Sequence, residues 1–169
     1  MERPIWLIGM MGSGKSTVAP LVAAALDSEW ADADSIIEEK TGRSITELFG
    51  DSEASFRVVE ADVMRVLAGG RAVVATGGGA VMTEAAGIMR ASGVVVWLRA
   101  TVDTLRDRIG SGSERPLLVN GLEAIEQIDG MRRDRYAALA DVVVDTDDRT
   151  PQEVADLVVA AWTSESPRR

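Results

Sequence analysis

The chain has 169 residues, a length typical of a single domain. It carries 18 basic and 27 acidic side chains, which give a formal net charge of −9, and it contains neither histidine nor cysteine. So acidic a chain argues against a nucleic-acid-binding protein or a binder of anionic membranes, because both need a basic face. The missing cysteines exclude disulfides and thiolate metal sites, and the missing histidines leave proton transfer to a carboxylate, a lysine or the single tyrosine, Tyr136.

Short β-branched runs alternate with helical patterns along the chain, which predicts a parallel sheet covered by helices, an α/β architecture. The expected strands are residues 5–8, 29–32, 72–75, 94–98 and 142–145. The expected helices are residues 15–27, 52–67, 83–91, 101–109, 122–138 and 151–162. No stretch approaches the roughly 18 apolar residues of a transmembrane helix, so we expect a soluble, cytoplasmic protein.

Local patterns mark several helix ends. Residues 44–47, Ser-Ile-Thr-Glu, have the form of a capping box and predict a short helix. Residues 150–153, Thr-Pro-Gln-Glu, predict another helix start, with proline at the first helical position. Pro20 lies inside the first expected helix, where its missing amide predicts a kink. Residues 163–169 are polar and are expected to fray.

Residues 9–17, Gly-Met-Met-Gly-Ser-Gly-Lys-Ser-Thr, connect the first expected strand to the first expected helix and match G-x-x-x-x-G-K-[ST]. In such a loop, glycines let successive backbone amides point at an anion, and the helix N-terminus adds to the attraction. Lys15 would reach the β- and γ-phosphates of a nucleotide, and the Ser16 hydroxyl would contact Mg²⁺. The motif in this context is specific for a nucleotide site, but it leaves an ATPase, a GTPase and a kinase open.

Two aspartates stand at the end of the second expected strand. Because side chains alternate along a strand, Asp32 and Asp34 are expected to point to the same side, into the crevice where open α/β sheets bind ligands. One carboxylate could organise Mg²⁺ while the other accepts a proton from an attacking hydroxyl. The alternative is a pair of solvated turn aspartates.

Two further groups follow these aspartates in the chain. Arg57 and Glu60 are three residues apart, on the side of their helix opposite Phe56, and an exposed ion pair is the simplest interpretation. Residues 77–79, Gly-Gly-Gly, follow the third expected strand and would expose backbone amides to a small ligand. A flexible turn is the alternative for these glycines.

Arginines mark the next two groups. Residues 110–116, Gly-Ser-Gly-Ser-Glu-Arg-Pro, predict a lid that could bring Arg115 to a transferring phosphoryl group, with a solvated linker as the alternative. Arg132, Arg133 and Arg135 precede Tyr136, and at most one or two of these arginines should face inward.

In this order the motifs resemble those of the shikimate kinases, and the resemblance runs from residue 5 to about residue 161. Residues 9–17 resemble the family's phosphate loop, and residues 32–45 resemble its D-x-D…IE…TGRSI segment. Residues 56–60, Phe-Arg-Val-Val-Glu, resemble its F-R-x-x-E element. The three glycines resemble its GGG turn, and residues 115–118, Arg-Pro-Leu-Leu, resemble its RPLL lid motif. Each motif is common, but the ordered set is specific.

The resemblance implies ATP and Mg²⁺ as cofactors, shikimate as substrate, and Asp34, Lys15 and Arg115 as catalytic residues. It implies that Asp34 holds the shikimate hydroxyls and acts as base, while Arg57 and Arg132 bind the carboxylate and Arg108 and Arg149 flank the adenine. The implied nucleotide-binding residues are Gly12, Ser13, Gly14, Lys15, Ser16, Thr17, Arg108, Arg115 and Arg149. The implied acceptor-binding residues are Asp34, Arg57, Gly77, Gly78, Gly79 and Arg132. The implied metal-binding residues are Ser16 and Asp32.

Arg132 is chosen because the family's arginine stands four residues before the tyrosine of an R-x-P-L-Y segment. In this chain the segment reads Arg-Arg-Asp-Arg-Tyr over residues 132–136, so that Asp134 and Arg135 replace the proline and the leucine.

The resemblance also implies a single domain, residues 1–169, with a three-layer α/β/α P-loop kinase fold. The five parallel strands would have the order 2-3-1-4-5, with a mobile lid at about residues 110–122. The implied reaction is the ATP-dependent phosphorylation of the 3-hydroxyl of shikimate to shikimate 3-phosphate, a step of aromatic amino acid (chorismate) biosynthesis. The expected enzyme is a cytoplasmic monomer without nucleic-acid or membrane partners.

Two alternatives remain beside this interpretation. One is a P-loop kinase for another small hydroxy acid such as gluconate, although F-R-x-x-E, GGG and RPLL together point away from it. The other is a nucleotide-binding regulator without catalytic activity, which would be expected to lack Lys15, Asp34 or Arg115.

Overall fold

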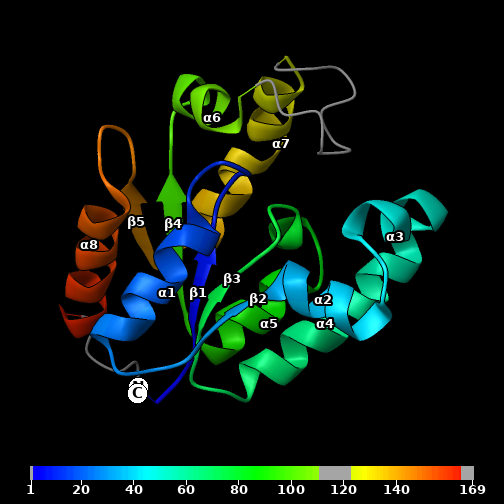
Figure 1. Ribbon diagram of the computed structural model, residues 1–169, viewed down its shortest axis with the longest axis horizontal. Coiled ribbons are helices and arrows are strands. Elements are labelled where there is room, and N and C mark those ends of the chain that lie inside the picture. Colours follow the sequence, from blue (N-terminus) through cyan, green and yellow to red (C-terminus); the bar gives the residue numbers. More distant parts are fainter. Residues whose placement is uncertain (1, 111–122, 165–169) are drawn as a thin grey trace.

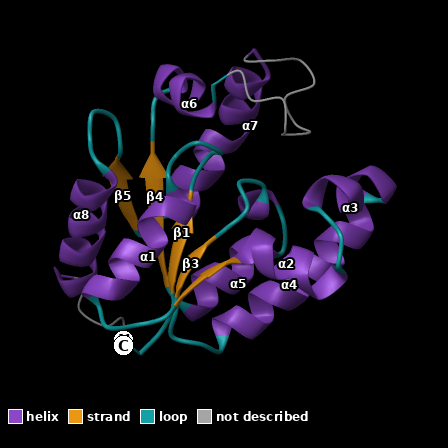
Figure 2. Cartoon of the chain, in the orientation of Figure 1, coloured by secondary structure: helices purple, strands orange, loops and turns teal. Residues whose placement is uncertain are grey.

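The computed structural model describes residues 2–110 and 123–164 of the chain. Within these residues, five strands form one sheet with helices on both of its faces (Figures 1 and 2). The strands are β1 (Ile5–Ile8), β2 (Trp30–Asp32), β3 (Val73–Ala75), β4 (Val94–Arg99) and β5 (Val142–Asp145). The helices are α1 (Lys15–Ala25), α2 (Ala33–Thr41), α3 (Ile45–Asp51), α4 (Glu53–Ala68), the 3₁₀ turn η1 (Ala80–Met82), α5 (Ala85–Ser92), α6 (Val102–Ile109), α7 (Glu123–Leu139) and α8 (Pro151–Ser164).

The sheet is parallel, with the strand order β2-β3-β1-β4-β5, as the sequence and the resemblance predict. β1 lies at its centre, where Trp6 stands in register with Val74 of β3 and Val95 of β4. Because all strands run in one direction, the loops that follow their carboxyl ends meet at one edge of the sheet. That edge is therefore where residues far apart in the sequence come together.

The continuous apolar runs of the strands are explained by helices on both faces. Ile5 and Leu7 of β1 pack toward α1 and α8, whereas Trp6 and Ile8 pack toward α4, α5 and α7. Figure 1 shows α1 and α8 side by side on one face of the sheet. All four side chains of β1 are buried, so the strand that leads into the glycine-rich loop is held rigidly.

A smaller apolar cluster holds α2, α3 and α4 together at one side of the sheet. It consists of the buried side chains of Ile37, Leu48, Phe56 and Val63. In Figure 1, α3 lies at the far right, well away from the sheet. This group of three helices forms one wall of the cavity described below.

The predicted capping patterns are confirmed. Ser44 and Glu47 form a capping box at the start of α3, and the Thr150 hydroxyl and the Glu153 carboxylate exchange hydrogen bonds with each other's backbone amides at the start of α8. α1 continues through Pro20 to Ala25.

The observed ends differ from the expected ones at several points. The sequence patterns do not predict α2. α8 runs to Ser164, so the first two residues of the tail that was expected to fray are helical. The remainder of that tail and almost all of the expected lid lie outside the described residues. Among the residues that are described, no helix is both long and apolar enough to cross a membrane.

Candidate active site

A cavity of about 1060 Å³ lies at the carboxyl edge of the sheet. It is bordered by the loop after β1, the start of α2, helices α3 and α4, the glycine turn after β3, and residues of α6, α7 and the β5–α8 connection. Its polar and glycine lining includes Gly12, Ser13, Gly14, Lys15, Ser16, Thr17, Asp32, Asp34, Glu38, Arg57, Glu60, Gly77, Gly78, Gly79, Arg108, Arg132 and Arg149. Every site residue predicted from the sequence, except Arg115 outside the described part, therefore borders one cavity.

The loop after β1 has the backbone of an anion cradle. Gly14 stands at the N-cap of α1 with a φ of 94°, a left-handed conformation that favours glycine, and Lys15 begins the helix. The buried Lys15 donates hydrogen bonds to the carbonyl oxygens of Gly9 and Met10, at 2.8 and 2.9 Å. A cation is thus held at a helix N-terminus that borders the cavity, an arrangement suited to a polyphosphate.

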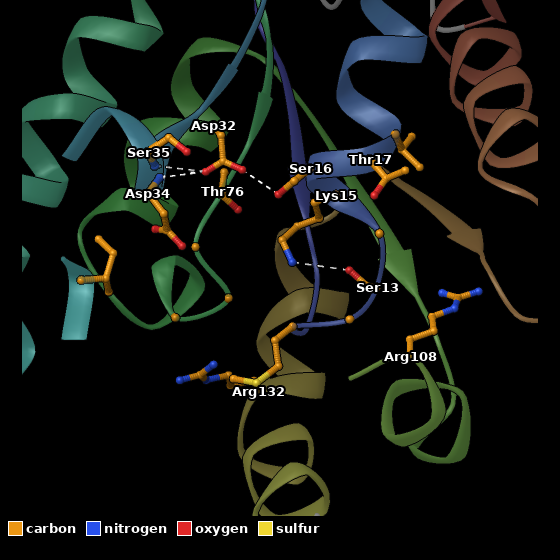
Figure 3. A pocket seen from close by; sticks show the side chains of 18 of the residues that line it. Ser13, Lys15, Ser16, Thr17, Asp32, Asp34, Ser35, Thr76, Arg108 and Arg132 are labelled. Carbon is orange, nitrogen blue, oxygen red and sulfur yellow. Dashed lines mark hydrogen bonds between the residues drawn. The ribbon is translucent and has the colours of Figure 1, made fainter. Parts of the chain in front are cut away.

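Ser16 and Asp32 lie beside this loop and contact each other. The Ser16 hydroxyl donates to Asp32 Oδ2 at 2.6 Å, as Figure 3 shows. The other carboxylate oxygen of Asp32 accepts from the backbone amides of Asp34 and Ser35 and so caps α2. The prediction that strand alternation aligns Asp32 with Asp34 is wrong, because the strand ends at Asp32 and a helix begins. Both aspartates nevertheless border the cavity, and they do so for a different geometrical reason.

The first turn of α2 aims Asp34 at the glycine turn. A Cβ atom added to Gly77 would lie 2.8 Å from Asp34 Oδ1, so the absence of a side chain there makes room for the carboxylate. Burial raises the pKa of Asp34 to about 6, and the nearby negative charge of Asp32 adds to this effect. Glu60 and Glu38 raise the pKa further, while Lys15 opposes them. Asp34 is therefore a carboxylate with the basicity of a general base that works near neutral pH.

Arg57 and Glu60 do not form the exposed pair that the sequence suggests. Glu60 is only 3% exposed, and both of its carboxylate oxygens accept from Arg57 Nη1, at 3.1 and 3.0 Å. Glu60 stands four residues after the buried Phe56, so the two share a helix face, and this periodicity was the available signal. The Arg57 guanidinium also lies over the rings of Phe49 and Phe56, 5.0 and 5.1 Å from their centroids. The fork of Arg57 is therefore held by a buried carboxylate and two aromatic rings.

The glycines of the turn after β3 face the functional side chains. Gly77 lies against Asp34 and Gly78 lies against Arg132, while an added Cβ at Gly79 would stand 3.1 Å from Arg57 Nη2 and 3.5 Å from Arg132 Nη2. The turn therefore brings a carboxylate and two guanidinium groups around one backbone segment. Two guanidinium forks beside a carboxylate base suit a small hydroxylated acid, because planar forks bind carboxylates in a bidentate manner.

Among the arginines of α7, only Arg132 borders the cavity. Arg133 turns to the other side, where it donates to Asp129 Oδ2 at 2.8 Å and to the Ala100 carbonyl oxygen at 3.2 Å. Arg135 is exposed. The structure therefore supports the register that places the inward-facing arginine four residues before Tyr136.

Two further arginines lie at the opposite end of the cavity. Arg108 donates to the side-chain and backbone oxygens of Thr146, at 2.9 and 2.6 Å, and Arg149 donates to the Asp145 carbonyl oxygen at 2.9 Å. In Figure 3, Lys15 lies between Asp34 on one side and Arg108 on the other. The cavity thus has two ends, with the glycine-rich loop between them.

Sequence reasoning missed three groups that support the site. Phe49 and Ile45 give an apolar wall to the end of the cavity that holds Asp34 and Arg57. Glu38 borders the cavity and accepts the backbone amide of Ile45, which ties α3 to α2. Tyr136 entered the sequence argument as a motif landmark, yet its hydroxyl contacts the glycine turn. Phe49 stands one helical turn after Ile45, and this spacing was a signal for their shared face.

Comparisons with known proteins agree with this geometry. The profile of the family described as shikimate kinase matches residues 11–163. A shikimate kinase of Synechococcus elongatus is 38% identical over 167 residues, which cover 96% of this chain and 80% of that protein. A shikimate kinase of Vibrio campbellii is 39% identical over 163 residues, which cover 94% of this chain and 95% of that protein.

Solved structures give the same result. The structure of a shikimate kinase from Acinetobacter baumannii in complex with shikimate superposes with a TM-score of 0.90 at 31% identity, covering 96% of this chain and 93% of that one. That of a shikimate kinase from Aquifex aeolicus gives a TM-score of 0.82 at 33% identity, covering 95% and 96% of the two chains. Similarity therefore extends over nearly the whole chain in both sequence and structure.

Proposed function

The chain belongs to the shikimate kinase family, and on that premise we propose how its residues carry out the phosphorylation of the 3-hydroxyl of shikimate by ATP. The reaction is a step of aromatic amino acid biosynthesis and yields shikimate 3-phosphate and ADP. The proposal assigns ATP to the end of the cavity that holds Lys15, Arg108 and Arg149. It assigns shikimate to the end that holds Asp34, Arg57 and Arg132.

The nucleotide end binds a polyphosphate chiefly through backbone amides and cations. Residues 12–17 supply the amides at the start of α1, and Lys15 neutralises charge on the β- and γ-phosphates. Arg108 and Arg149, both held by the β5–α8 connection, would flank the adenine. Arg115, which lies outside the described residues, is proposed to contact the phosphates from the lid.

The residues Ser16 and Asp32 fit a magnesium ion. Mg²⁺ prefers oxygen ligands and is usually held by one or two protein groups together with phosphate oxygens and waters. A hydroxyl and a carboxylate 2.6 Å apart, next to the phosphate loop, provide such a donor pair. Among the described residues no cluster of three or more acidic side chains is arranged to hold a metal alone, in keeping with a shared site. When bound, Mg²⁺ would neutralise charge on the transferring phosphoryl group.

At the acceptor end, Arg57 and Arg132 would bind the shikimate carboxylate, and Gly78 would offer a backbone contact. Anchoring the carboxylate orients the ring, so that a hydroxyl is presented to Asp34 with the γ-phosphate on its far side. Asp34 then accepts the hydroxyl proton as the oxygen attacks the γ-phosphorus of ATP, and the bond from that phosphorus to the β,γ-bridging oxygen breaks, so that ADP leaves. With a pKa of about 6, Asp34 is ionised at neutral pH and remains more basic than an ordinary aspartate.

One observation carries the proposal: Asp34, Arg57 and Arg132 converge on the glycine turn inside the same cavity as the phosphate loop. The experiment is the substitution Asp34→Asn, with ADP release measured across shikimate, quinate, gluconate and nucleoside monophosphates. We expect wild type to prefer shikimate, and Asp34→Asn to keep nucleotide affinity while losing nearly all turnover. A near-normal kcat in the variant would refute the base assignment, and a preference for gluconate would refute the acceptor.

We further propose that the enzyme acts as a cytoplasmic monomer that needs neither a nucleic acid nor a membrane. The net charge of −9 supports the absence of nucleic-acid and anionic-membrane partners. Sedimentation of the purified protein with and without ligands measures the oligomeric state.

A further inference from the structure

We propose that Tyr136 is a positioning residue for the acceptor: its hydroxyl holds Gly78 and α7 together, so that the turn and Arg132 bind shikimate as one preformed unit. The inference rests on the proposed function and deepens it, because it explains how the acceptor end is kept in shape. The established reaction needs no proton from this phenol. Its hydroxyl nevertheless connects α7 to the glycine turn, the two elements that would enclose the substrate carboxylate.

The contact itself is short and buried. The Tyr136 side chain is 0% exposed, and its hydroxyl donates to the Gly78 carbonyl oxygen at 2.6 Å. The ring stacks on the nearly buried ring of Trp97 in β4, with centroids 5.7 Å apart and planes at 24°. The phenol therefore connects β4 with the glycine turn, and its position is fixed from both sides.

Arg132 lies one helical turn before Tyr136, so the two side chains share a face of α7. A Cβ added to Gly78 would stand 3.4 Å from Arg132 Nη1, which places the guanidinium against the same glycine whose carbonyl oxygen accepts from Tyr136. The positive charge of Arg132 acts to lower the pKa of Tyr136, which also reflects their closeness. The bond from Tyr136 to Gly78 thus joins the arginine-bearing helix directly to the turn.

The same bond orients a peptide plane. In a trans peptide the carbonyl and the following amide point in opposite directions. A Gly78 carbonyl fixed toward Tyr136 therefore also fixes the direction of the Gly79 amide, beside Arg57. The carbonyl oxygens of Gly77 and Gly79 accept from the backbone amides of Ala80 and Met82, so the Tyr136 hydroxyl supplies the partner of the remaining glycine carbonyl in the turn.

The substituted part of the R-x-P-L-Y-like segment fits this role. Asp134 and Arg135 are exposed on α7, so replacing the expected proline and leucine leaves the contact face unchanged. The four-residue spacing between Arg132 and Tyr136 is what the geometry requires. Because burial raises the pKa of Tyr136 to about 12, the hydroxyl remains a donor at every pH at which the enzyme is assayed.

The test is Tyr136→Phe, which keeps the ring stack and removes only the hydroxyl. We expect the KM and the Kd for shikimate to rise about 5- to 20-fold, because a carbonyl loses its partner and the turn loses its fixed shape. The KM for ATP and the kcat at saturating shikimate should stay within about twofold.

Ser92→Ala is the matched control. The partly buried Ser92 hydroxyl donates to the Ile88 carbonyl oxygen at 2.7 Å and does not border the cavity. We expect this variant to lower the melting temperature as Tyr136→Phe does, while leaving the KM for shikimate unchanged.

The outcomes separate this proposal from the proposed function. If wild type does not phosphorylate shikimate, the function fails; if it does and Tyr136→Phe only lowers the melting temperature, the positioning role fails. An equal rise in the KM of both substrates would also overturn it, because general loosening would explain that result. In the double variant with Arg132→Ala, the effect of Tyr136→Phe on shikimate affinity should shrink; full additivity would contradict a shared unit.

Discussion

Asp34 illustrates how a single residue is made basic at the expense of stability. Its carboxylate is partly buried, and Asp32, Glu60 and Glu38 all add to the rise in its pKa, with Lys15 as the opposing charge. A pKa of about 6 in the folded protein, against an ordinary value of 3.8, means that the fold holds the proton more tightly than the unfolded chain does. Ionisation of Asp34 therefore costs folding free energy in the protein without nucleotide or metal.

This cost predicts a pH-dependent gain in stability for Asp34→Asn in the ligand-free protein. Between about pH 4 and pH 6 the folded state binds more protons at this position than the unfolded state, so this contribution to the free energy of unfolding falls as pH rises. At pH 7.5 the variant should be more stable than wild type by up to about 3 kcal/mol, and at pH 4 the difference should nearly vanish. Urea denaturation at both pH values measures it.

The exposed substitution Asp156→Asn on α8 controls for the general loss of one negative charge. A less stable Asp34→Asn at pH 7.5 would mean that the ionised carboxylate is favoured by contacts other than those described.

Glu60 and Tyr136 show the limit of sequence reasoning at this scale. The composition and motifs identify Arg57 and Arg132 as candidate binding residues. The residues that hold them in place are buried, and a local sequence pattern predicts burial only weakly. Glu60 was expected at the surface, because acidic residues are rarely buried without partners. Its partners are Arg57 and the Thr83 hydroxyl, and Thr83 lies in the connection between η1 and α5. Only the packed structure reveals such a pairing.

Among the elements, α2 shows why a correct site can follow from an incorrect local assignment. Its buried side chains, Ala33 and Ile37, occupy a single stripe, and this weak pattern is too short to predict a helix. Strand alternation applied past Asp32 therefore predicts both aspartates on one side of a strand. In the structure, Asp32 caps the helix and Asp34 lies in its first turn, so both still reach the cavity. The position of the two aspartates at the carboxyl end of a strand predicted correctly that they border the cavity. The predicted direction of their side chains was wrong.

The glycine turn after β3 leads to a prediction in which each position has its own effect. In Gly77→Ala the new methyl group would displace the Asp34 carboxylate, so kcat should fall about 10-fold or more. In Gly79→Ala it would press on Arg57, which Glu60 and Glu53 hold in place, so the KM for shikimate should rise by a similar factor. Steady-state kinetics with varied shikimate and ATP separate the two effects.

Gly87→Ala in α5 is the matched control for this series, since nothing lies within 4 Å of an added Cβ there and alanine favours a helix. It should leave both kinetic constants unchanged. Identical kinetic defects in Gly77→Ala and Gly79→Ala would show that the turn moves as a whole, which would contradict the separate contacts.

For the whole molecule, the alternation of strands and helices was sufficient to predict a parallel sheet, because crossovers of this kind have only one common solution. The strand order came from the resemblance, since apolar runs alone do not tell which strands are neighbours. The central position of β1, with Trp6 beside both β3 and β4, is what brings the glycine turn next to the phosphate loop. The residues that line each end of the cavity could therefore be predicted from the sequence. That they line the same cavity could be known only from the sheet topology.

The charged side chains that border the cavity differ in balance from those of the whole chain. The chain has a net charge of −9, yet Lys15, Arg57, Arg108, Arg132 and Arg149 all border the cavity. Four acidic side chains border it as well, namely Asp32, Asp34, Glu38 and Glu60, so five cations against four acids leave the lining with a formal charge of +1. The lining therefore opposes anions less than the acidic chain as a whole does, which suits two anionic substrates.

A cavity with two separate ends predicts that the two ligands stabilise the protein independently. ADP with Mg²⁺ avoids turnover, and at about 100 times its Kd it should add about 2.7 kcal/mol to the free energy of unfolding, as should shikimate. For a chain of this length each would raise the melting temperature by about 5 to 10 °C, and both together should approach the sum. Lys15→Met should remove the response to ADP and keep the response to shikimate. A melting temperature with both ligands no higher than with one would mean that they compete for one place, and the two-ended cavity would then be the wrong description of this site.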